Sequence, residues 1–541
     1  MNERQKNSLI LGGIASSAGV FVTKVIGILY VVPFAALATE PNLSYYARAY
    51  NVYEMILNVS ISGLPFAIAT LVAKYMLKEQ YKTVLLVRKL STAVLAVLGF
   101  VMMIGLLFLA TPIAQISIGG AIDSLEVERT RNVMMIMALA IFTVPLLSSY
   151  RGFYQGLKEL NHYAFSQVLE QVARVVFLLS LGFILVVLLG YDPIWAVYGA
   201  IFSTSISALV AIAYFILKDR KTLVEIQEKA KVSLEQVPSN KELLKELYYF
   251  AIPFLLNVLL NSTSNFVNLL FFNQAMLMHG ETIVQADLYY SMVMFTTNKL
   301  TSIPQVVAPG FITAIIPYVT TSFEKKDFEQ LKHYILDSIM TVVYLTLPLA
   351  FYLLAISSEV YYVMYGSSHV VLGAEVLALN SWTGLTFNVA SVTNALMMAL
   401  RLRKQNLMVT ALTVSVAALF YIPMVAYFGY AGSIYSKLIT QVSMIILNLY
   451  LIKRTFKVQY SKSALQISQM LIGILSMQLV FMVLRFLGLD ILAYNRWLAT
   501  LVLGLYGLLS LGAYIAVTAA FKLPQLILHF DYQKIKARFF K

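Results

Sequence analysis

Apolar runs separated by short polar breaks occupy almost the whole chain. A helix needs roughly 20 apolar residues to cross a bilayer, and fourteen runs of about that length or more predict spanning helices. Proline interrupts several runs, as at Pro65, Pro145 and Pro304. We therefore expect kinked helices whose freed backbone groups find protein or water partners. The expected spans, each to within about four residues, are 9–38, 45–75, 84–111, 132–157, 163–189, 194–217, 247–278, 287–319, 334–356, 370–400, 405–428, 431–452, 464–488 and 497–521.

The composition agrees with this pattern. Apolar residues make up 60% of the 541-residue chain and charged residues 12%, whereas a soluble domain has about 45–50% apolar and about 25% charged residues. We therefore predict an all-α polytopic membrane protein with about 14 transmembrane helices.

The 40 Lys and Arg residues give the orientation. If the N-terminus is cytoplasmic, thirty of them fall in cytoplasmic segments and four in external ones, namely Arg129, Arg131, Arg485 and Arg496. Cytoplasmic loops of membrane proteins collect Lys and Arg, so we expect both termini in the cytoplasm and attribute the net charge of +14 to topology rather than to nucleic-acid binding. Met1–Ser8 is polar and no small-residue cleavage site follows the first apolar run, so we expect no cleaved signal.

The charged stretch Lys218–Glu246 predicts a division into two lobes, because six spans precede it and six follow it before two extra spans. A repeated spacing supports this weakly, since Ala49 to Pro65 matches Leu288 to Pro304. The basic and apolar residues of the C-terminal tail predict a helix lying on an anionic membrane surface. The expected domains are 1–217 (first lobe), 218–246 (cytoplasmic linker), 247–453 (second lobe), 454–521 (two extra helices) and 522–541 (cytoplasmic amphipathic tail).

Residues for several kinds of chemistry are missing from the sequence. There is no cysteine, and the five histidines stand singly without the spacing of metal ligands. No glycine-rich phosphate-binding loop occurs, and the longest external loop, 112–131, has only three acidic residues. We therefore expect neither an enzyme nor a metal or cofactor site.

Six basic residues fall inside the predicted spans, where burying a charge costs about 2.5–3.5 kcal/mol even on insertion scales. At 1.5 Å per residue, Lys24 lies about 22 Å from the inner end of its helix and Lys299 about 18 Å from the outer end of its own. Both are thus near the bilayer midplane, where a side chain reaches the headgroups least easily. The six residues are Lys24, Arg48, Arg151, Arg174, Lys299 and Lys437.

The other four have alternative interpretations. Arg48 and Lys437 lie about 6–9 Å from the outer face and Arg151 about 10 Å from the inner one, so each can bind substrate or reach headgroups. Arg174 follows Glu170 by four residues, which favours a structural ion pair on one helix face.

Against the six basic residues we set two acidic ones away from the span ends, Glu54 and Glu170, which gives an expected excess of four positive charges. Glu54 can balance Lys24, or can take a coupling cation or a proton. An excess of positive charge suits an anionic substrate, most naturally one with phosphates, whose oxygens accept charge-assisted bonds from Lys and Arg. A drug-cation exporter would need the opposite sign.

Several motifs resemble the SpoVB/YtgP-type polysaccharide transport proteins, relatives of the MurJ-type lipid II flippases in the MOP exporter superfamily. Near the N-terminus they are Lys24-Val-Ile-Gly-Ile-Leu-Tyr30, Ala49-Tyr-Asn-Val-Tyr53 and Ser60-Ile-Ser-Gly-Leu-Pro65. The most specific match is Arg151-Gly-x-x-Gln155-Gly156 followed by Ser166-Gln-Val-Leu-Glu170-Gln-x-x-Arg174. In addition, Asn298-Lys-Leu-Thr-Ser-Ile-Pro304 is similar to the segment in which MurJ-type proteins have a functional arginine before a proline. The resemblance covers essentially the whole chain.

The resemblance implies two lobes in a V around a central cationic cavity, with the two extra helices forming a groove for a lipid tail. It implies a bacterial plasma-membrane flippase that carries undecaprenyl-diphosphate-linked peptidoglycan precursor, lipid II, from the inner to the outer leaflet. By position, the resemblance implies roles for Lys24, Lys299 and the motif residues Arg151, Gln155, Glu170 and Arg174, whereas Glu54 departs from the family pattern. Together with the charges inside the spans, this predicts substrate binding by Lys24, Arg48, Arg151, Gln155, Arg174 and Lys299, with Glu54 and Glu170 in coupling or charge balance.

Other functions stay open from the sequence alone. The span 370–400 has Met398-Ala399 where the family usually repeats Gln-Gly, so the glycolipid can instead belong to teichoic acid, capsule or spore cortex. A multidrug antiporter of the MATE type is less favoured, because such proteins have twelve spans and acidic cavity groups. We expect a monomer without a cofactor. Its transport would be driven by a coupling ion, the membrane potential or the supply of precursor.

Overall fold

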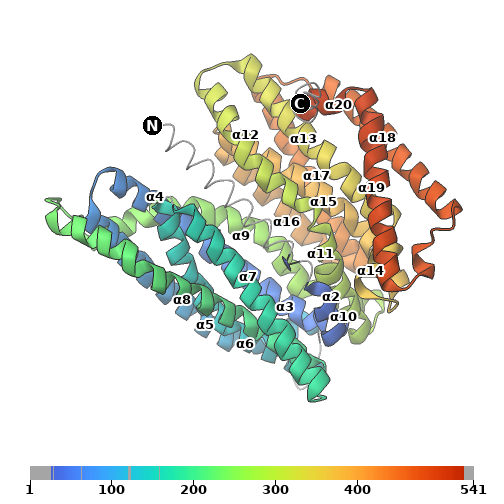
Figure 1. Ribbon diagram of the computed structural model, residues 1–541, viewed down its shortest axis with the longest axis horizontal. Coiled ribbons are helices and arrows are strands. Elements are labelled where there is room, and N and C mark those ends of the chain that lie inside the picture. The colour runs from blue at the N-terminus through green and yellow to red at the C-terminus, as the bar shows by residue number, and fades with distance from the viewer. Residues whose placement is uncertain (1–25, 28–29, 63, 120–123, 158, 529–541) are drawn as a thin grey trace, which may run out of the picture. The chain divides into compact units, whose positions relative to one another are not determined.

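The computed structural model describes residues 26–27, 30–62, 64–119, 124–157 and 159–528 (Figure 1). Every regular element in this part of the chain is a helix, so the predicted all-α class is confirmed. Ten of the helical segments are long and apolar enough to cross a membrane. They correspond to α5 (Tyr81–Ile118), α6 (Leu125–Gly156), α7 (Leu160–Gly182) with the π-turn η1 (Phe183–Leu188), α8 (Ile194–Val232), α13 (Phe328–Ala355), α15 (Val370–Ala399), α16 (Arg403–Phe428), α17 (Tyr430–Phe456), α18 (Ser461–Phe486) and α19 (Arg496–Ala520).

The four remaining predicted spans take other forms, so the count of fourteen stays a prediction. Span 45–75 consists of two helices, α3 (Leu43–Ser62) and α4 (Leu64–Leu77). Span 247–278 lies within the 40-residue α9 (Asn240–His279). Span 9–38 falls largely outside the described residues and ends in α2 (Val31–Ala38).

Span 287–319 is interrupted. It contains α10 (Ile283–Ser291), the π-turn η2 (Met292–Thr296), the five-residue α11 (Thr297–Thr301), the 3₁₀ turn η3 (Pro304–Val306) and α12 (Val307–Glu324). Pro304 has no N–H to donate to the preceding turn and its ring obstructs a continuous helix, which agrees with the kink expected from the sequence.

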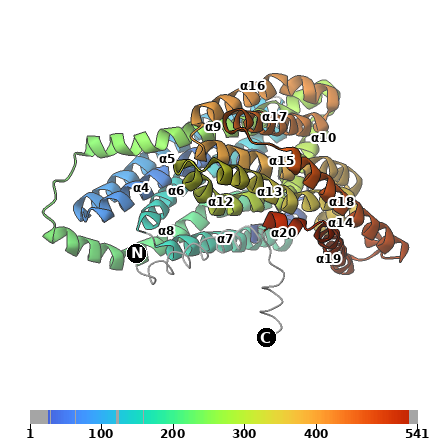
Figure 2. The same cartoon turned by 90° about the horizontal axis from the view of Figure 1, so that it is seen from above.

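The charged segment between α8 and α9 is mostly helical. α8 continues to Val232, and α9 starts at Asn240 behind a capping box between Ser239 and Glu242. Figure 2 shows the long ends of these helices and the loop that joins them. The loop is fixed to the start of α5, where Glu235 accepts a hydrogen bond of 2.8 Å from the Thr83 hydroxyl. The predicted linker is therefore a pair of helix extensions with a short connection.

By packing, the chain forms two compact units: Met1–Phe295 with Val425–Gly429, and Thr296–Met424 with Tyr430–Lys541. The domain division predicted at the charged segment stays a prediction. In the first unit, α6 is the central helix. The protein buries 67% of the apolar 18-residue stretch of α6, compared with 22% of the corresponding stretch of α5.

Two larger apolar cores and one small one are described in the second unit. One of the larger cores joins α13, the short α14 (Ser357–Tyr365), α15, α18 and α19, and the other joins α12, α13, α15 and α17. The small one consists of Ala390, Val409 and Met444. α19 starts at the cap Asn495, whose side chain accepts from the backbone of Leu498 at 3.0 Å. Of the predicted amphipathic tail, only α20 (Leu523–Leu528) is described, and the rest lies outside the described residues.

Candidate functional site

Three of the predicted site residues meet in the first unit. The Glu170 carboxylate accepts a bond of 2.8 Å from Arg151 of α6 on one oxygen and a bond of 2.6 Å from Arg174 on the other. The three side chains are only 11–13% exposed. The ion pair expected between Glu170 and Arg174 is therefore present. Arg151 also bonds to Glu170, so the three side chains form one cluster.

Arg151 is held by two further contacts. Its Nε donates to the Ser166 hydroxyl and its Nη2 donates to the Ser166 carbonyl, each at 3.1 Å. One carboxylate thus serves two guanidinium groups, which leaves the cluster with one net positive charge. The buried Nε of Arg174 has no partner among the described residues, so part of its donor capacity is unused.

The two glycines after Arg151 bring α6 close to α4. A Cβ on Gly152 would lie 2.8 Å from the Pro65 carbonyl oxygen, and a Cβ on Gly156 would lie 2.6 Å from the Val72 Cβ. Only glycine permits this approach, as in other membrane helix pairs with small residues four apart. The motif Arg-Gly-x-x-Gln-Gly therefore combines one charged group with a packing surface.

The structure places Gln155 and Glu54 on two different helices. Gln155 is exposed on α6, and Glu54 is half-buried on α3. Lys24 lies outside the described residues, so its predicted position near the midplane stays a prediction.

Arg48 of α3 is completely buried, with a side-chain exposure of 0%. Its Nη2 donates at 2.6 Å to Asp287 of α10 and at 2.8 Å to Asn273 of α9, and its guanidinium lies 4.4 Å from the ring centre of Tyr290. Its charge is therefore met inside the protein instead of at the headgroups. The Nε and Nη1 atoms of Arg48 have no partner in the described part of the chain.

Sequence reasoning missed Asp287 and Asn273. Asp287 stands at the expected outer end of span 287–319, so it was not counted among the intramembrane charges. The structure buries it to 3% exposure, and Asn273 donates a further bond of 2.7 Å to its carboxylate. An isolated carboxylate beside an aromatic run, Tyr289-Tyr290, is the one signal in the sequence that marks it.

Lys299 belongs to the second unit. It is half-buried on the five-residue α11, between the π-turn η2 and Pro304. Interrupted membrane helices commonly carry substrate-binding groups, because their backbone is tolerated only beside protein or a water-filled cavity. Lys299 is the predicted site residue that lies at such a break.

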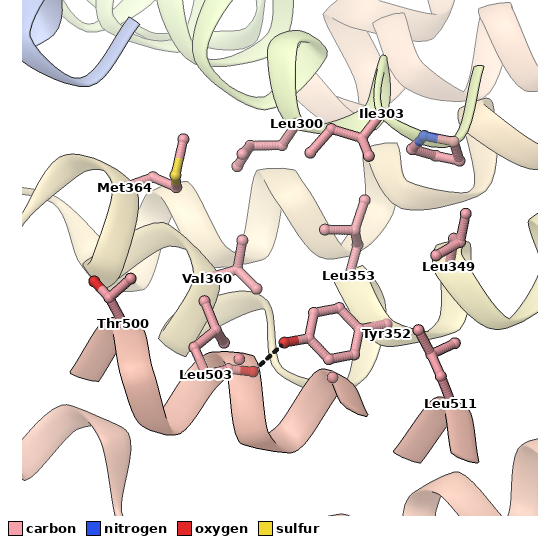
Figure 3. A pocket seen from close by; sticks show the side chains of 13 residues that line it. Leu300, Ile303, Leu349, Tyr352, Leu353, Val360, Met364, Thr500, Leu503 and Leu511 are labelled. Atoms are coloured by element: carbon pink, nitrogen blue, oxygen red, sulfur yellow. Dashed lines mark hydrogen bonds between the residues drawn. The ribbon is translucent and has the colours of Figure 1, made fainter. Parts of the chain in front are cut away.

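An apolar cavity of about 390 Å³ adjoins the same segment (Figure 3). Leu300 and Ile303 line it from the segment, and α13, α14 and α19 supply the other walls. The Tyr352 hydroxyl donates to the Leu503 carbonyl at 2.8 Å across one wall, so this polar group is satisfied. The cavity can therefore accept a hydrocarbon chain without leaving that hydroxyl unpaired.

No metal centre is visible in the described residues, where no three His, Asp or Glu side chains gather in a way that could hold a metal ion. The described site is built from Arg, Lys, Glu, Asp and amide side chains.

More than half of the chain matches the model of a known protein family. The family model described as "Polysaccharide biosynthesis protein" matches residues 9–323. The chain belongs to this family. The match contains the glycine motif of α6, the Glu170 cluster and Lys299, so the resemblance read from these motifs is confirmed.

Two relatives of this family member are from Bacillus subtilis (strain 168). "Lipid II flippase MurJ" is 26% identical over 491 residues, covering 89% of this chain and 90% of the relative. "Stage V sporulation protein B" is 24% identical over 375 residues, covering 69% of this chain and 70% of the relative.

Solved structures with the same fold come from the MOP superfamily. An inward-facing multidrug resistance MATE family transporter superposes with a TM-score of 0.66 at 16% identity, covering 80% of this chain and 95% of the transporter. At this identity the likeness shows the fold alone, and it agrees with the predicted all-α polytopic fold.

Proposed function

We propose that this protein is a flippase that moves lipid II, the undecaprenyl-diphosphate-linked peptidoglycan precursor, from the inner to the outer leaflet by alternating access. Membership of the polysaccharide biosynthesis family and the similarity to MurJ over 89% of the chain support the proposal. The protein is proposed to act as a monomer in the bacterial plasma membrane, with both termini cytoplasmic and no enzymatic activity.

One structural observation carries the proposal. Lys299 and two cavity-lining residues, Leu300 and Ile303, lie on one short segment of an interrupted helix. A lipid-linked diphosphate is an amphiphile that needs a cation for its phosphates and an apolar surface for its chain. Lysine provides the charge, and burial of the chain removes apolar surface from water or headgroups.

We propose that Lys299 and Lys24 contact the diphosphate directly. Both are predicted near the midplane, and lysine offers three rotatable donors to phosphate oxygens. The cavity between α11, α13 and α19 is proposed to hold part of the lipid chain. A groove formed by α18 and α19 is proposed to hold the rest of the chain. Arg151, Gln155 and Arg174 are proposed to contact the head group, with Glu170 balancing the two arginines.

Arg48 has a different standing among the proposed binding residues. Asp287 and Asn273 occupy one end of its guanidinium, and only its Nε and Nη1 remain for a ligand. These two atoms are completely buried, so substrate could reach them only if helices around Arg48 moved apart. Glu54 is proposed to balance charge or to bind a coupling ion.

A second candidate is a flippase for another lipid-linked glycan, such as a precursor of teichoic acid, capsule or spore cortex. The family description names polysaccharide biosynthesis in general, and the diphosphate chemistry would be the same. The two candidates differ in the sugar head group and not in the charges that hold the phosphates.

Rescue of cells depleted of their lipid II flippase tests the proposal. We expect the wild-type gene to restore growth, and Lys24→Ala and Lys299→Ala to reach the membrane at normal levels without restoring it. Arginine at either position should retain substantial activity, because the charge is kept. Rescue by both alanine variants at wild-type levels would contradict the role of the lysines, and failure of the expressed wild type would favour the second candidate.

A further inference from the structure

The interruption of the helix that carries Lys299 leaves backbone groups that need partners. Pro304 has no N–H, and the change from π-helix through α11 to 3₁₀-helix breaks the regular ladder of hydrogen bonds. A backbone polar group without a partner costs several kcal/mol in hydrocarbon. Something in the second unit must therefore stabilise this conformation.

α15 supplies these partners from one face. Asn388 is completely buried and spans the break, since its Nδ2 donates to the Pro304 carbonyl at 2.7 Å and its Oδ1 accepts from the Ala308 N–H at 3.3 Å. Two turns earlier, Asn380 Nδ2 donates to the Thr297 hydroxyl at 2.9 Å. Asn380 and Asn388 are eight residues apart, which places them on the same side of an α-helix.

Gly384 lies midway between these two asparagines and allows the segment to approach. A Cβ at this position would lie 2.9 Å from the Pro304 Cγ and 3.1 Å from the Thr301 carbonyl oxygen. The pattern Asn380-x-x-x-Gly384-x-x-x-Asn388 thus provides two amide clamps with a gap between them. α14 adds a third contact, because the Tyr365 hydroxyl donates to the Thr296 carbonyl at 2.9 Å.

These contacts determine the direction of Lys299. Thr297 bonds to α15, and residues two apart on a helix point to nearly opposite sides. Lys299 is therefore directed away from α15, and the clamps at Thr297 and Pro304 limit the rotation of the short helix between them. A small rotation would change the position of its ammonium group by several ångström, because a lysine side chain is long.

We propose that Asn380, Gly384 and Asn388 are positioning residues for substrate transport, which act by fixing the orientation of Lys299. This inference rests on the proposed role of Lys299 as a diphosphate contact. The role proposed for α15 is to hold the interrupted helix in place. This role is separate from substrate binding, since the three residues contact the interrupted helix.

Because the chain has no cysteine, Lys299→Cys introduces a single thiol for the test. Lipid II translocation is measured in vesicles containing the variant before and after treatment with an aminoethyl methanethiosulfonate reagent, which adds an ammonium group. We expect the untreated variant to be inactive and the treated one to recover, whereas a neutral methyl reagent should give no recovery. If the ammonium gives no recovery, the proposed role of Lys299 fails, and the positioning proposal fails with it.

The positioning role is then measured by adding Asn388→Ala to Lys299→Cys. Asn448→Ala is the matched control, because Asn448 is also completely buried and its Nδ2 donates at 2.8 Å to Asn394, away from the interrupted helix. We expect recovery by the ammonium reagent to fall at least tenfold with Asn388→Ala and to stay within twofold with Asn448→Ala. Equal recovery in the two backgrounds would overturn the positioning role while leaving that of Lys299 intact.

Gly384→Ala keeps the proposal testable if Asn388→Ala does not reach the membrane. The added methyl group should displace Pro304 and lower ammonium-dependent recovery at least tenfold. Gly512→Ala on α19 is its control, because a Cβ there meets nothing within 4 Å. Full recovery with Gly384→Ala would contradict the proposal.

Discussion

Glu170 shows how one contact between helices changes the meaning of a sequence motif. Its spacing to Arg174 is that of an ion pair within one helix, and the sequence alone predicts that exchanging the two residues would preserve folding. In the structure Arg151 bonds to the other carboxylate oxygen at 2.8 Å. The exchange would therefore place an arginine beside Arg151.

We predict that the double variant Glu170→Arg, Arg174→Glu accumulates poorly in the membrane, whereas Glu170→Asp accumulates nearly normally. Glu170→Ala should be destabilised by about 3–5 kcal/mol, as expected when one partner of a buried ion pair is lost. Thermal unfolding of the detergent-purified variants provides the measurement. Normal accumulation and stability of the exchanged variant would show that Arg151 does not depend on Glu170.

Arg48 and Asp287 form the second buried pair, and the sequence did not predict it. We expect Asp287→Asn to destabilise the protein strongly, because the guanidinium then stays fully buried without a carboxylate. The double variant Arg48→Met, Asp287→Leu should be less destabilised than Arg48→Met or Asp287→Leu alone, since no charge remains buried. Unfolding temperatures that simply add across the double-mutant cycle would rule out this coupling.

At the scale of helices, the two glycines of α6 fix its distance from α4. We predict that Gly152→Ala and Gly156→Ala each lower stability by about 1–3 kcal/mol, the usual cost of overpacking, because the added methyl group meets the backbone or Val72 of α4. Gly105→Ala on α5 is the matched control, since a Cβ there meets nothing within 4 Å. Equal effects of the three substitutions would contradict the packing role.

The helices themselves could largely be predicted from the sequence, because long apolar runs determine where a chain crosses a bilayer. The predicted spans 84–111, 132–157, 370–400 and 497–521 correspond to the continuous helices α5, α6, α15 and α19. Span 287–319 differs. Its proline predicts a kink, but neither hydropathy nor Pro304 predicts that Asn388 of α15 stabilises the break. Such a break depends on contacts between distant residues.

The candidate site could be predicted in part for the same reason. Motif spacing predicted that Glu170 and Arg174 interact, since that contact lies within one helix. The partners of Arg48 are more than two hundred residues away in the sequence, and no local pattern identifies them. Asp287, which was left out of the count of charges in the spans, also reduces the expected excess of positive charge because it neutralises Arg48.

For the whole molecule, the charge distribution and membership of the polysaccharide biosynthesis family are the basis on which we propose a transporter of an anionic lipid. The sequence predicted an excess of basic residues in the spans, and the structure shows Arg48, Arg151 and Arg174 paired with two carboxylates. Lys299, at the break between η2 and Pro304, is one of the two lysines that we propose as diphosphate contacts. The central claim is that transport of the lipid diphosphate requires a positive charge at position 299.

Translocation of fluorescent lipid II in vesicles containing the purified protein tests this claim most directly. The measured quantity is the rate at which the lipid becomes accessible to a membrane-impermeant reagent on the opposite side. The account predicts translocation by the wild type, substantial translocation by Lys299→Arg, and at least a tenfold lower rate for Lys299→Gln at equal protein content. Translocation by Lys299→Gln at the wild-type rate would contradict it.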